Sequence, residues 1–230
     1  MQRAQPVRTL APVVPAVKAG RAARQAAAPA PELLPPRATS DGTLRRLQEA
    51  ALVGFGDRGY HGVSIRELAE AAGITVSSIY AHVKAKQELL GELVLIAHME
   101  HNELLRAALL DAPPDPAEQI RALMRAHVSL HATYPLLARV ANRELHALSE
   151  ENAARALAYR HGSEELFLDV IQRGVAQGVF SVPDAWLAVA AIAAMGLRVA
   201  EWYTPESGRT PEEIAEAYAL FAVRVVTEAG

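Results

Sequence analysis

The chain has 230 residues, of which 51% are hydrophobic, 21% are charged and none is cysteine, so disulfide scaffolds, thiolate metal sites and cysteine nucleophiles are excluded. Only 5% of the residues are aromatic, and alanine and leucine supply most of the hydrophobic content, which favours helices over strands. A formal net charge of −3 argues against a uniformly basic protein that coats nucleic acid, and the lack of cysteine fits a cytoplasmic location.

Residues 1–40 differ from the rest of the chain in charge and composition. Six basic residues and one acidic residue give them a net charge of +5, whereas the other 17 basic and 25 acidic residues give −8. Seven of the 14 prolines lie there, and Pro12, Pro15 and Lys18 interrupt any apolar region of a secretory signal. We expect a disordered basic Ala/Pro/Arg-rich tail that adds salt-dependent phosphate contacts to DNA. A transit peptide and a misassigned start codon are the alternatives.

A helical pattern begins at Thr43. Leucines and alanines recur at helical spacing as far as Phe55, and Gly56 and Gly59 are expected to end this helix. No segment of the sequence alternates as a strand would. Further helices are predicted over 65–71, 75–81, 86–109, 116–132, 135–148, 149–178 with a kink near Gly162, 185–203 and 211–226.

The second and third of these helices form a helix-turn-helix. Ser64 and Glu67 make a capping box at the first of them, Gly73 allows a left-handed turn, and Thr75 caps the next helix. Small residues follow Thr75, which permits close approach to DNA near a helix N-terminus. Many helix pairs with a glycine turn bind nothing, so the longer surrounding sequence carries more weight.

The sequence over about Thr43–Leu90 resembles the DNA-binding domain of the TetR family of bacterial transcriptional regulators. Its most diagnostic part is the run Ile79-Tyr80-Ala81-His82, followed by Lys86, Glu88 and Leu89. Val83 departs from the family, which usually has phenylalanine there, and the change loses core volume without removing a DNA contact. The resemblance implies an all-α protein, with a three-helix DNA-binding domain over 41–90 and a helical ligand-binding and dimerisation domain over 91–230.

The resemblance also implies a function. A homodimer would read a pseudo-palindromic operator in the major groove, repress transcription and be released by a small-molecule effector; activation is the alternative outcome. Thr75 and Lys86 would contact phosphate. The alternative for Arg45 and Arg46 is that they are solvated helix residues without a DNA contact. The alternative for Tyr80 is that it only packs within the protein. The implied DNA-binding residues are Arg45, Arg46, Ser64, Arg66, Thr75, Val76, Ser77, Ser78, Tyr80, His82 and Lys86.

Residues 91–230 contain no motif of comparable specificity. The small residues of 185–203 and the amphipathic last helix suit dimerisation, with packing within one chain as the alternative. The segments 174–180, 201–205 and 210–215 are weakly similar to actinobacterial-type members that respond to lipids, which implies a hydrophobic or acyl-CoA-type ligand. Arginines among apolar helices could pair with a CoA phosphate, with interhelical hydrogen bonds as the alternative. The candidate ligand-binding residues are His127, His131, Arg139, Asn142, Arg143, His146 and Trp202.

Four other possibilities are less favoured. His127 with His131, and His98 with His101, have the spacing of metal ligands, but without a clear third ligand we expect no metal and no cofactor. No phosphate-binding loop or nucleophile elbow supports a helical enzyme, which stays an alternative beside an adaptor that does not bind DNA. The 13 uncharged residues Ala185–Leu197 are fewer than the roughly 20 that a membrane span needs, so no membrane contact is expected.

Overall fold

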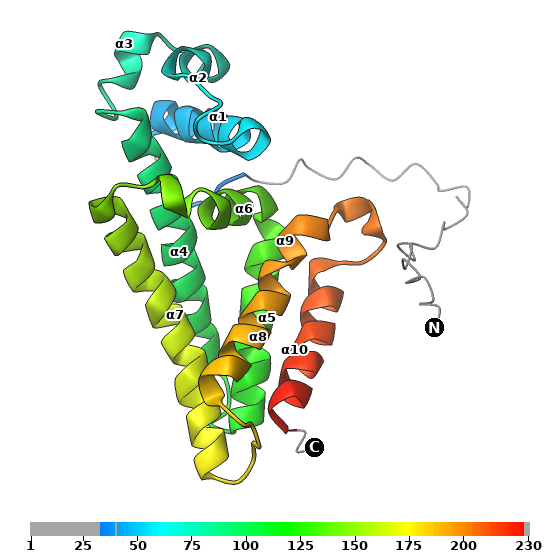
Figure 1. Ribbon diagram of the computed structural model, residues 1–230. Coiled ribbons are helices and arrows are strands. Elements are labelled where there is room, and N and C mark those ends of the chain that lie inside the picture. Colours follow the sequence, from blue (N-terminus) through cyan, green and yellow to red (C-terminus); the bar gives the residue numbers. More distant parts are fainter. Residues whose placement is uncertain (1–32, 40, 228–230) are drawn as a thin grey trace, which may run out of the picture. The chain divides into compact units, whose positions relative to one another are not determined.

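The computed structural model describes residues 33–39 and 41–227, which all belong to one compact unit, Pro31–Gly230. Most of the expected basic tail lies outside these residues. Every regular element in the described ranges is a helix, which confirms the predicted all-α class (Figure 1). The elements are α1 Gly42–Arg58, α2 Ile65–Ala72, α3 Val76–Ile79, α4 Lys86–Asp111, α5 Pro116–Thr133, α6 Pro135–Arg143, η1 Leu145–Ala147, α7 Glu150–Ala176, α8 Ala185–Leu197, α9 Val199–Trp202, η2 Pro205–Ser207 and α10 Pro211–Thr227.

The predicted start and stop signals of the helix-turn-helix are confirmed. The Ser64 hydroxyl accepts from the backbone N–H of Glu67 at 3.3 Å, and the Glu67 carboxylate accepts from the backbone N–H of Ser64 at 2.7 Å. Gly73 adopts φ 66°, the left-handed conformation that a glycine enters without a side-chain clash. Thr75 then caps α3 by accepting from the N–H of Ser78 at 3.1 Å. These bonds satisfy backbone donors that each helix start would otherwise leave unpaired.

One of the two expected helix ends in α1 is wrong. The helix continues through Gly56 and ends only at Gly59, which has φ 74°. A Cβ atom added to Gly56 would lie 2.4 Å from Cδ1 of Leu136, so the glycine is needed for the close approach of α6 rather than for termination. A sequence pattern cannot show this, because Leu136 lies 80 residues away along the chain.

Other boundaries differ by a few residues. The predicted helix 75–81 ends at Ile79, and the predicted helix 135–148 is divided into α6 and the short η1. The predicted helix 185–203 is likewise divided at Arg198 into α8 and α9. In contrast, α7 is one continuous helix through Gly162, where a kink was expected.

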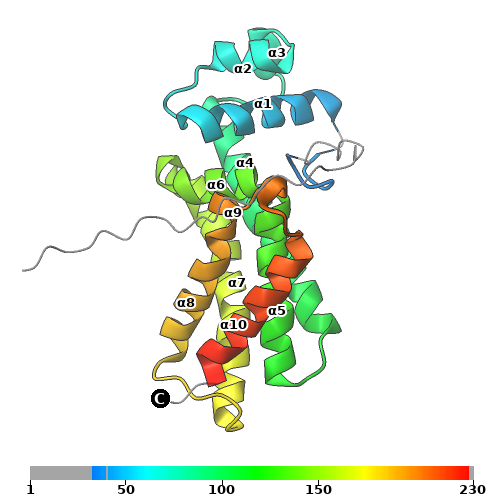
Figure 2. The ribbon, with the colours of Figure 1, turned by 90° about the vertical axis from the view of Figure 1, so that its right-hand side faces the viewer.

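Two hydrophobic clusters organise the helices, and the long α4 belongs to both. The first cluster joins α1, α2 and α3 to the N-terminal half of α4 and to α6. The second joins the far end of α4, at Leu105, to α5, α7, α8 and α10. Figures 1 and 2 show α1–α3 at one end of α4, with α5 and α7 along its remaining length, and α8 and α10 pack on α5. A helix shared by two clusters provides a mechanical connection between them.

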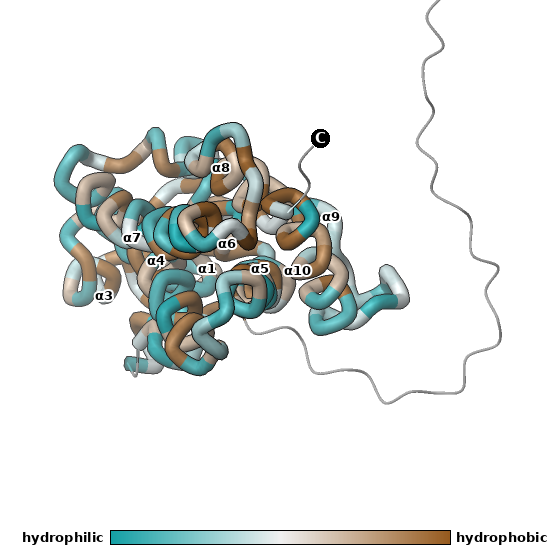
Figure 3. The backbone as a smooth tube through the Cα atoms, turned by 90° about the horizontal axis from the view of Figure 1, so that it is seen from below, coloured by the Kyte–Doolittle hydropathy of each residue, from teal (hydrophilic) through white to brown (hydrophobic). Residues whose placement is uncertain are grey.

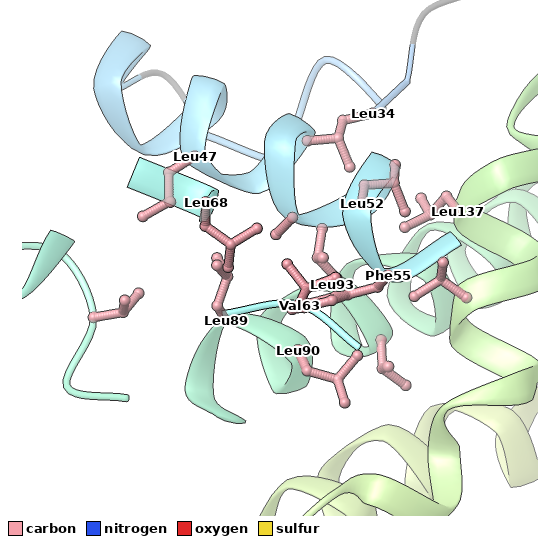
Figure 4. Packing of buried hydrophobic residues seen from close by; sticks show 14 of the residues in the cluster. Leu34, Leu47, Leu52, Phe55, Val63, Leu68, Leu89, Leu90, Leu93 and Leu137 are labelled. Atoms are coloured by element: carbon pink, nitrogen blue, oxygen red, sulfur yellow. The ribbon is translucent and has the colours of Figure 1, made fainter. Parts of the chain in front are cut away.

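Residues 33–39 depart from the expected disordered tail, because Leu34 is fully buried in the first cluster (Figure 4). The guanidinium of Arg45 donates to the backbone carbonyls of Leu34 at 2.9 Å and Pro35 at 3.3 Å. Arg37 forms an ion pair with Glu103 on α4. The segment therefore packs as an additional part of the first hydrophobic cluster, held by α1 and α4.

The most apolar part of the described chain is Ala185–Trp202, which comprises α8 and α9 (Figure 3). By length and composition alone it could cross a membrane, but core helices of soluble proteins pass the same test. Ala188, Val189 and Ile192 pack into the second cluster. The other face of α8 is exposed.

Candidate DNA-binding and effector sites

The predicted recognition helix is held by its buried side and displays polar groups on the other. Ile79 and Val83 are buried in the first cluster, so valine fills the position at which phenylalanine was expected. The Tyr80 side chain is 56% exposed. Among the predicted DNA-binding residues, the exposed ones are Arg46, Ser64, Arg66, Thr75, Ser77 and Tyr80, and the half-buried ones are Arg45, Val76, Ser78, His82 and Lys86.

Hydroxyl groups cluster at the start of α3. Thr75 Oγ1 lies 2.8 Å from both Ser77 Oγ and Ser78 Oγ, besides accepting from the backbone N–H of Ser78. Hydroxyls in such a cluster can rotate to donate to a phosphate or to a base edge. At the other end of the motif, His82 Nδ1 lies 3.6 Å from Asp41 Oδ2, so His82 connects the recognition segment to the cap of α1.

Two of the predicted phosphate-binding cations are engaged within the protein. Arg45 holds residues 34 and 35, as described above, and also pairs with Glu49 at 3.1 Å. Lys86 Nζ donates to the backbone carbonyls of Tyr60 at 2.8 Å and Val63 at 2.7 Å. These contacts give both residues a structural role, because most of their hydrogen-bond donors are used inside the fold. Arg46 and Arg66, in contrast, extend from exposed positions.

Ser64 is exposed, but its hydroxyl and backbone N–H already form the hydrogen bonds of the capping box with Glu67. Its hydroxyl and backbone bonds to Glu67, together with the Arg58 guanidinium, lower the pKa of the Glu67 carboxyl from its ordinary value to about 2. The carboxylate therefore stays charged over the whole range in which the protein would meet DNA. A phosphate near Ser64 would meet this negative charge, so Ser64 is the least favourable of the exposed candidates for a phosphate contact.

A cavity of about 70 Å³ lies among α4, α5, α6, α7 and α8. Its lining is mainly apolar, with Leu130, Phe167, Val189 and Leu197 among the larger side chains. Arg160 and Glu164, which pair at 3.1 Å, and Asn142 are polar residues of the lining. Four histidines complete it, namely His98, His101, His127 and His131.

Three of these histidines are linked in a chain. His101 Nε2 lies 2.8 Å from His127 Nδ1, His127 Nε2 lies 3.0 Å from the carbonyl oxygen of Ala193 on α8, and His131 Nδ1 lies 2.7 Å from the carbonyl oxygen of His127. Gly196 makes this possible, because a Cβ atom there would lie 2.0 Å from Cδ2 of His127. The fourth histidine, His98, has a buried Nε2 with no hydrogen-bond partner among the described residues.

Burial keeps all four imidazoles neutral. Desolvation lowers the pKa of His127 to about 3 and that of His98 to about 4, and it also lowers the pKa of His101 and His131. The histidines act on one another in the same direction, since charging one disfavours charging its neighbour. The cavity thus offers hydrogen-bonding nitrogens without net charge.

The predicted ligand-binding residues separate into two groups. His127, His131 and Asn142 line the cavity. Arg139 instead donates to the carbonyl of Ala200 at 2.8 Å, and Arg143 pairs with Glu201 at 2.5 Å, so both tie α6 to α9 and do not line this cavity. His146 is exposed in η1, and Trp202 is 44% exposed beside Tyr203; neither lines the cavity.

The sequence indicates His98 and His101 only as possible metal ligands. Their spacing of three residues on α4 places them on one helix face, opposite the pair of histidines on α5. Two histidine pairs on successive long helices are the sequence pattern that could have predicted a shared histidine cluster. Within the described part of the chain, no group of three or more suitable side chains is arranged to hold a metal ion.

Two family models match the chain. Residues 47–93, from α1 to the start of α4, match the model described as bacterial regulatory proteins, tetR family. Residues 113–226, which include α5–α9 and all but the last residue of α10, match a model described as tetracyclin repressor-like, C-terminal domain. The chain belongs to the TetR family. This confirms the resemblance inferred from the helix-turn-helix and identifies the protein as a helix-turn-helix transcriptional regulator.

Individual TetR relatives agree with the assignment. A crystal structure of the TetR family transcriptional regulator PfmR from Thermus thermophilus is 32% identical, with a TM-score of 0.71 over 78% of this chain and 97% of that one. The transcriptional repressor KstR2 of Mycolicibacterium smegmatis is 26% identical over 184 residues, covering 79% of this chain and 89% of that protein. The fold also matches AibR in complex with isovaleryl coenzyme A and operator DNA, at 24% identity and a TM-score of 0.70 over 78% and 97% of the two chains.

Proposed function

We propose that this TetR-family protein is a homodimeric repressor that binds a pseudo-palindromic operator and releases it when a small apolar ligand enters the cavity among α4–α8. The observation that carries the proposal is that α4 belongs to both hydrophobic clusters and bears two of the four cavity histidines. A ligand that favours a different position of α4 would change the spacing of the two DNA-binding domains in the dimer.

The surface proposed to contact DNA is formed by the outer side of α3 and the exposed cations near it. Ser77 and Tyr80 are placed to meet base edges or the sugar-phosphate backbone, because Ile79 anchors the opposite side of the helix. Arg46 on α1 and Arg66 on α2 are placed to meet flanking phosphates. Both remain exposed, unlike Arg45 and Lys86, whose donors serve the fold.

A mobility-shift assay with the DNA upstream of the protein's own gene tests this surface. Tyr80→Ala should lower operator affinity about thirtyfold or more, because each subunit of the dimer loses one contact of about 1–3 kcal/mol. Arg66→Ala removes one phosphate contact from each subunit of the dimer, so it should weaken binding and reduce the slope of log affinity against log salt by about two. Arg209→Ala removes an exposed cation from the segment between η2 and α10, and it should change neither quantity. Unchanged binding in both test variants would contradict the proposed surface.

The proposed dimer interface is the outer face of α8 and α10, which pack against each other (Figure 2). On α8 the exposed residues recur at helical spacing, with Trp186 63% and Leu187 59% exposed. On α10, Leu220 and Phe221 are 52% and 44% exposed one turn before the exposed Val225. Apolar side chains collected on one face of two adjacent helices favour burial against a second copy of the same face.

Sedimentation velocity tests the interface. Leu220→Asp places a charge in the centre of the apolar face and should convert dimer to monomer at micromolar protein. Leu110→Asp is the matched control, because Leu110 is 85% exposed at the far end of α4 and should leave the dimer intact. A dimer that persists in Leu220→Asp would require another interface.

The ligand is proposed to be hydrophobic or of acyl-CoA type. The apolar lining supports the hydrophobic part, and the relative AibR binds isovaleryl coenzyme A. Arg139 and Arg143 are engaged with α9, so a CoA phosphate would have to use other cations, with Arg160 the one in the lining. Adding candidate acyl-CoAs and the corresponding free alcohols to the mobility-shift assay should show which class dissociates the complex. Failure of every apolar compound to do so would contradict the effector role of the cavity.

A further inference from the structure

The hydrogen bonds among the cavity histidines determine which nitrogens carry protons. A carbonyl oxygen only accepts, so His127 Nε2 donates to Ala193 and His131 Nδ1 donates to the His127 carbonyl. A neutral imidazole carries one N–H, which leaves His127 Nδ1 as an acceptor. His101 Nε2 must therefore be the donor in its 2.8 Å bond to His127 Nδ1. The tautomers of all three rings follow from this chain of bonds.

Two nitrogens of these rings remain hydrogen-bond acceptors without a donor. His101 Nδ1 and His131 Nε2 carry lone pairs, and neither atom has a hydrogen-bond partner among the residues that the structure describes. His131 is the better defined of the two, because it is only 3% exposed and its ring is fixed by the bond to the His127 carbonyl. An acceptor that lines an apolar cavity without a protein donor favours a ligand that supplies one, so such a ligand would gain affinity there.

We propose that the cavity recognises an apolar ligand by a neutral hydroxyl group, which donates a hydrogen bond to His131 Nε2. This inference rests on the proposed function for the existence of an effector, and it specifies the chemistry of the effector's buried end. An aliphatic alcohol, or an acyl chain with a hydroxyl at its buried end, has the required form. The apolar side chains of Leu130, Phe167 and Val189 would surround the hydrocarbon part.

Ligands with other end groups are disfavoured by the same atoms. At the position of the proposed hydroxyl, a ketone or aldehyde oxygen would face the lone pairs of His131 and His101 and could accept from neither. A carboxylate would bring a negative charge beside two acceptors, and the cation of the lining, Arg160, is already paired with Glu164. A pure hydrocarbon would fill the space but would leave His131 Nε2 without a donor. Discrimination among these four end groups is therefore the signature of the proposed site.

Four probes of equal carbon number test the inference without DNA, namely 1-pentanol, 2-pentanone, pentanoate and pentane. Short chains are suitable, because the cavity has a volume of only about 70 Å³. The full-length protein, labelled with 15N in its histidine rings, is titrated with each probe. We expect 1-pentanol to bind about tenfold more tightly than the other three and to shift the Nε2 resonance of His131.

Two variants complete the experiment. His131→Phe keeps a ring but removes the acceptor, and it should reduce the preference for 1-pentanol over 2-pentanone to less than about twofold. His146→Phe alters an exposed histidine outside the cavity and should leave the preference for 1-pentanol intact. If His131→Phe does not fold, the Nε2 shift in the unmodified protein decides the question.

The outcomes are distinct for the two proposals. Equal or tighter binding of 2-pentanone or pentanoate, or no binding of any probe at millimolar concentration, would overturn the hydroxyl inference. The protein could bind 1-pentanol selectively while no hydroxylated apolar compound dissociates its operator complex. That result would support the hydroxyl site and would contradict the effector role of the cavity. Loss of operator binding in the recognition-helix assay bears on neither result, because the titration contains no DNA.

Discussion

Lys86 Nζ, at the first position of α4, donates to the backbone carbonyl of Tyr60 at 2.8 Å and lies 4.2 Å from the centroid of the Tyr60 ring. With the further bond to Val63, the ammonium group ties the loop between α1 and α2 to the helix that continues into the second hydrophobic cluster. A cation that is bonded to two carbonyls and an aromatic face stabilises the DNA-binding domain itself.

Replacing Lys86 should therefore change stability in the absence of DNA. Lys86→Met leaves two carbonyls without their charged donor, and it should lower the free energy of unfolding by about 2 kcal/mol. Urea denaturation at fixed protein concentration measures this. Lys84→Met is the control, since Lys84 is exposed two residues earlier. If Lys86→Met loses operator affinity with unchanged stability, the family's phosphate role would be the correct one.

The burial of Leu34 makes residues 33–39 part of the folded domain. Leu34→Ala should destabilise the protein by about 3 kcal/mol, because it opens a cavity in the first cluster. Leu33→Ala, at a half-buried neighbour, should cost distinctly less. Equal effects of the two variants in urea denaturation would mean that Leu34 does not pack as described.

The basic tail can be tested separately from this packing. Residues 1–32 carry five basic residues and one acidic residue, and their removal leaves Leu34 in place. We expect the truncated protein to keep its stability but to bind operator less tightly, with a shallower salt dependence. Removing residues 1–40 should in addition destabilise the fold. An unchanged salt slope after removal of 1–32 would show that the tail does not contact DNA.

Short-range features of this fold were predictable from sequence, and long-range packing was not. The Ser64–Glu67 capping box and the Gly73 turn depend on bonds within a few residues, so residue types at fixed spacing suffice to identify them. Leu34 lies in a proline-rich segment without periodicity, and its burial depends on a cluster whose other members, such as Leu137, are far away in the chain. Composition alone therefore assigned it to a tail.

The sites show the same division. The resemblance located the recognition helix, but it could not show that the Arg45 guanidinium bonds to the carbonyls of residues 34 and 35. On α5, the spacing of His127 and His131 indicated one shared face. Only the packing of α4 against α5 brings His101 within 2.8 Å of His127, and no pattern within either helix specifies that encounter.

Gly196 should be intolerant of even a methyl group. A Cβ atom would lie 2.3 Å from His127 Nε2, so Gly196→Ala must displace the ring and break its 3.0 Å bond to Ala193. We expect a loss of about 1–3 kcal/mol in the free energy of unfolding, typical of overpacking, and loss of the His127 Nε2–H signal in NMR spectra. Gly42→Ala, where no atom lies within 4 Å of the added carbon, should be neutral or slightly stabilising.

The neutral histidines make stability depend on pH in a defined direction. The pKa of His98 is about 4 in the folded protein, below its ordinary value near 6.5, so below pH 6.5 the unfolded chain takes up a proton that the folded chain does not. Stability should fall from pH 6.5 towards pH 4, by up to about 1.4 kcal/mol per pH unit from His98. Above pH 6.5 this contribution is constant.

Urea denaturation between about pH 7.5 and pH 5, at one protein concentration, measures this dependence. His98→Leu removes both the titrating group and a buried nitrogen without a partner among the described residues, so the variant should gain stability relative to the unmodified protein as the pH falls. His146→Leu serves as the control for removal of an exposed histidine. A pH dependence that is identical in His98→Leu and the unmodified protein would contradict the assignment.

The closeness of Gly196 to His127 also has a consequence for genetics. The glycine belongs to α8, whose other face is exposed, whereas the recognition helix lies in a separate hydrophobic cluster. Missense changes at codon 196 should thus damage the cavity while leaving the operator-binding surface unaltered. In a genetic screen, alleles that keep transcription repressed in the presence of inducer should recur at codons 127, 131 and 196. Alleles that leave transcription constitutively active should instead occur at codons 77 and 80.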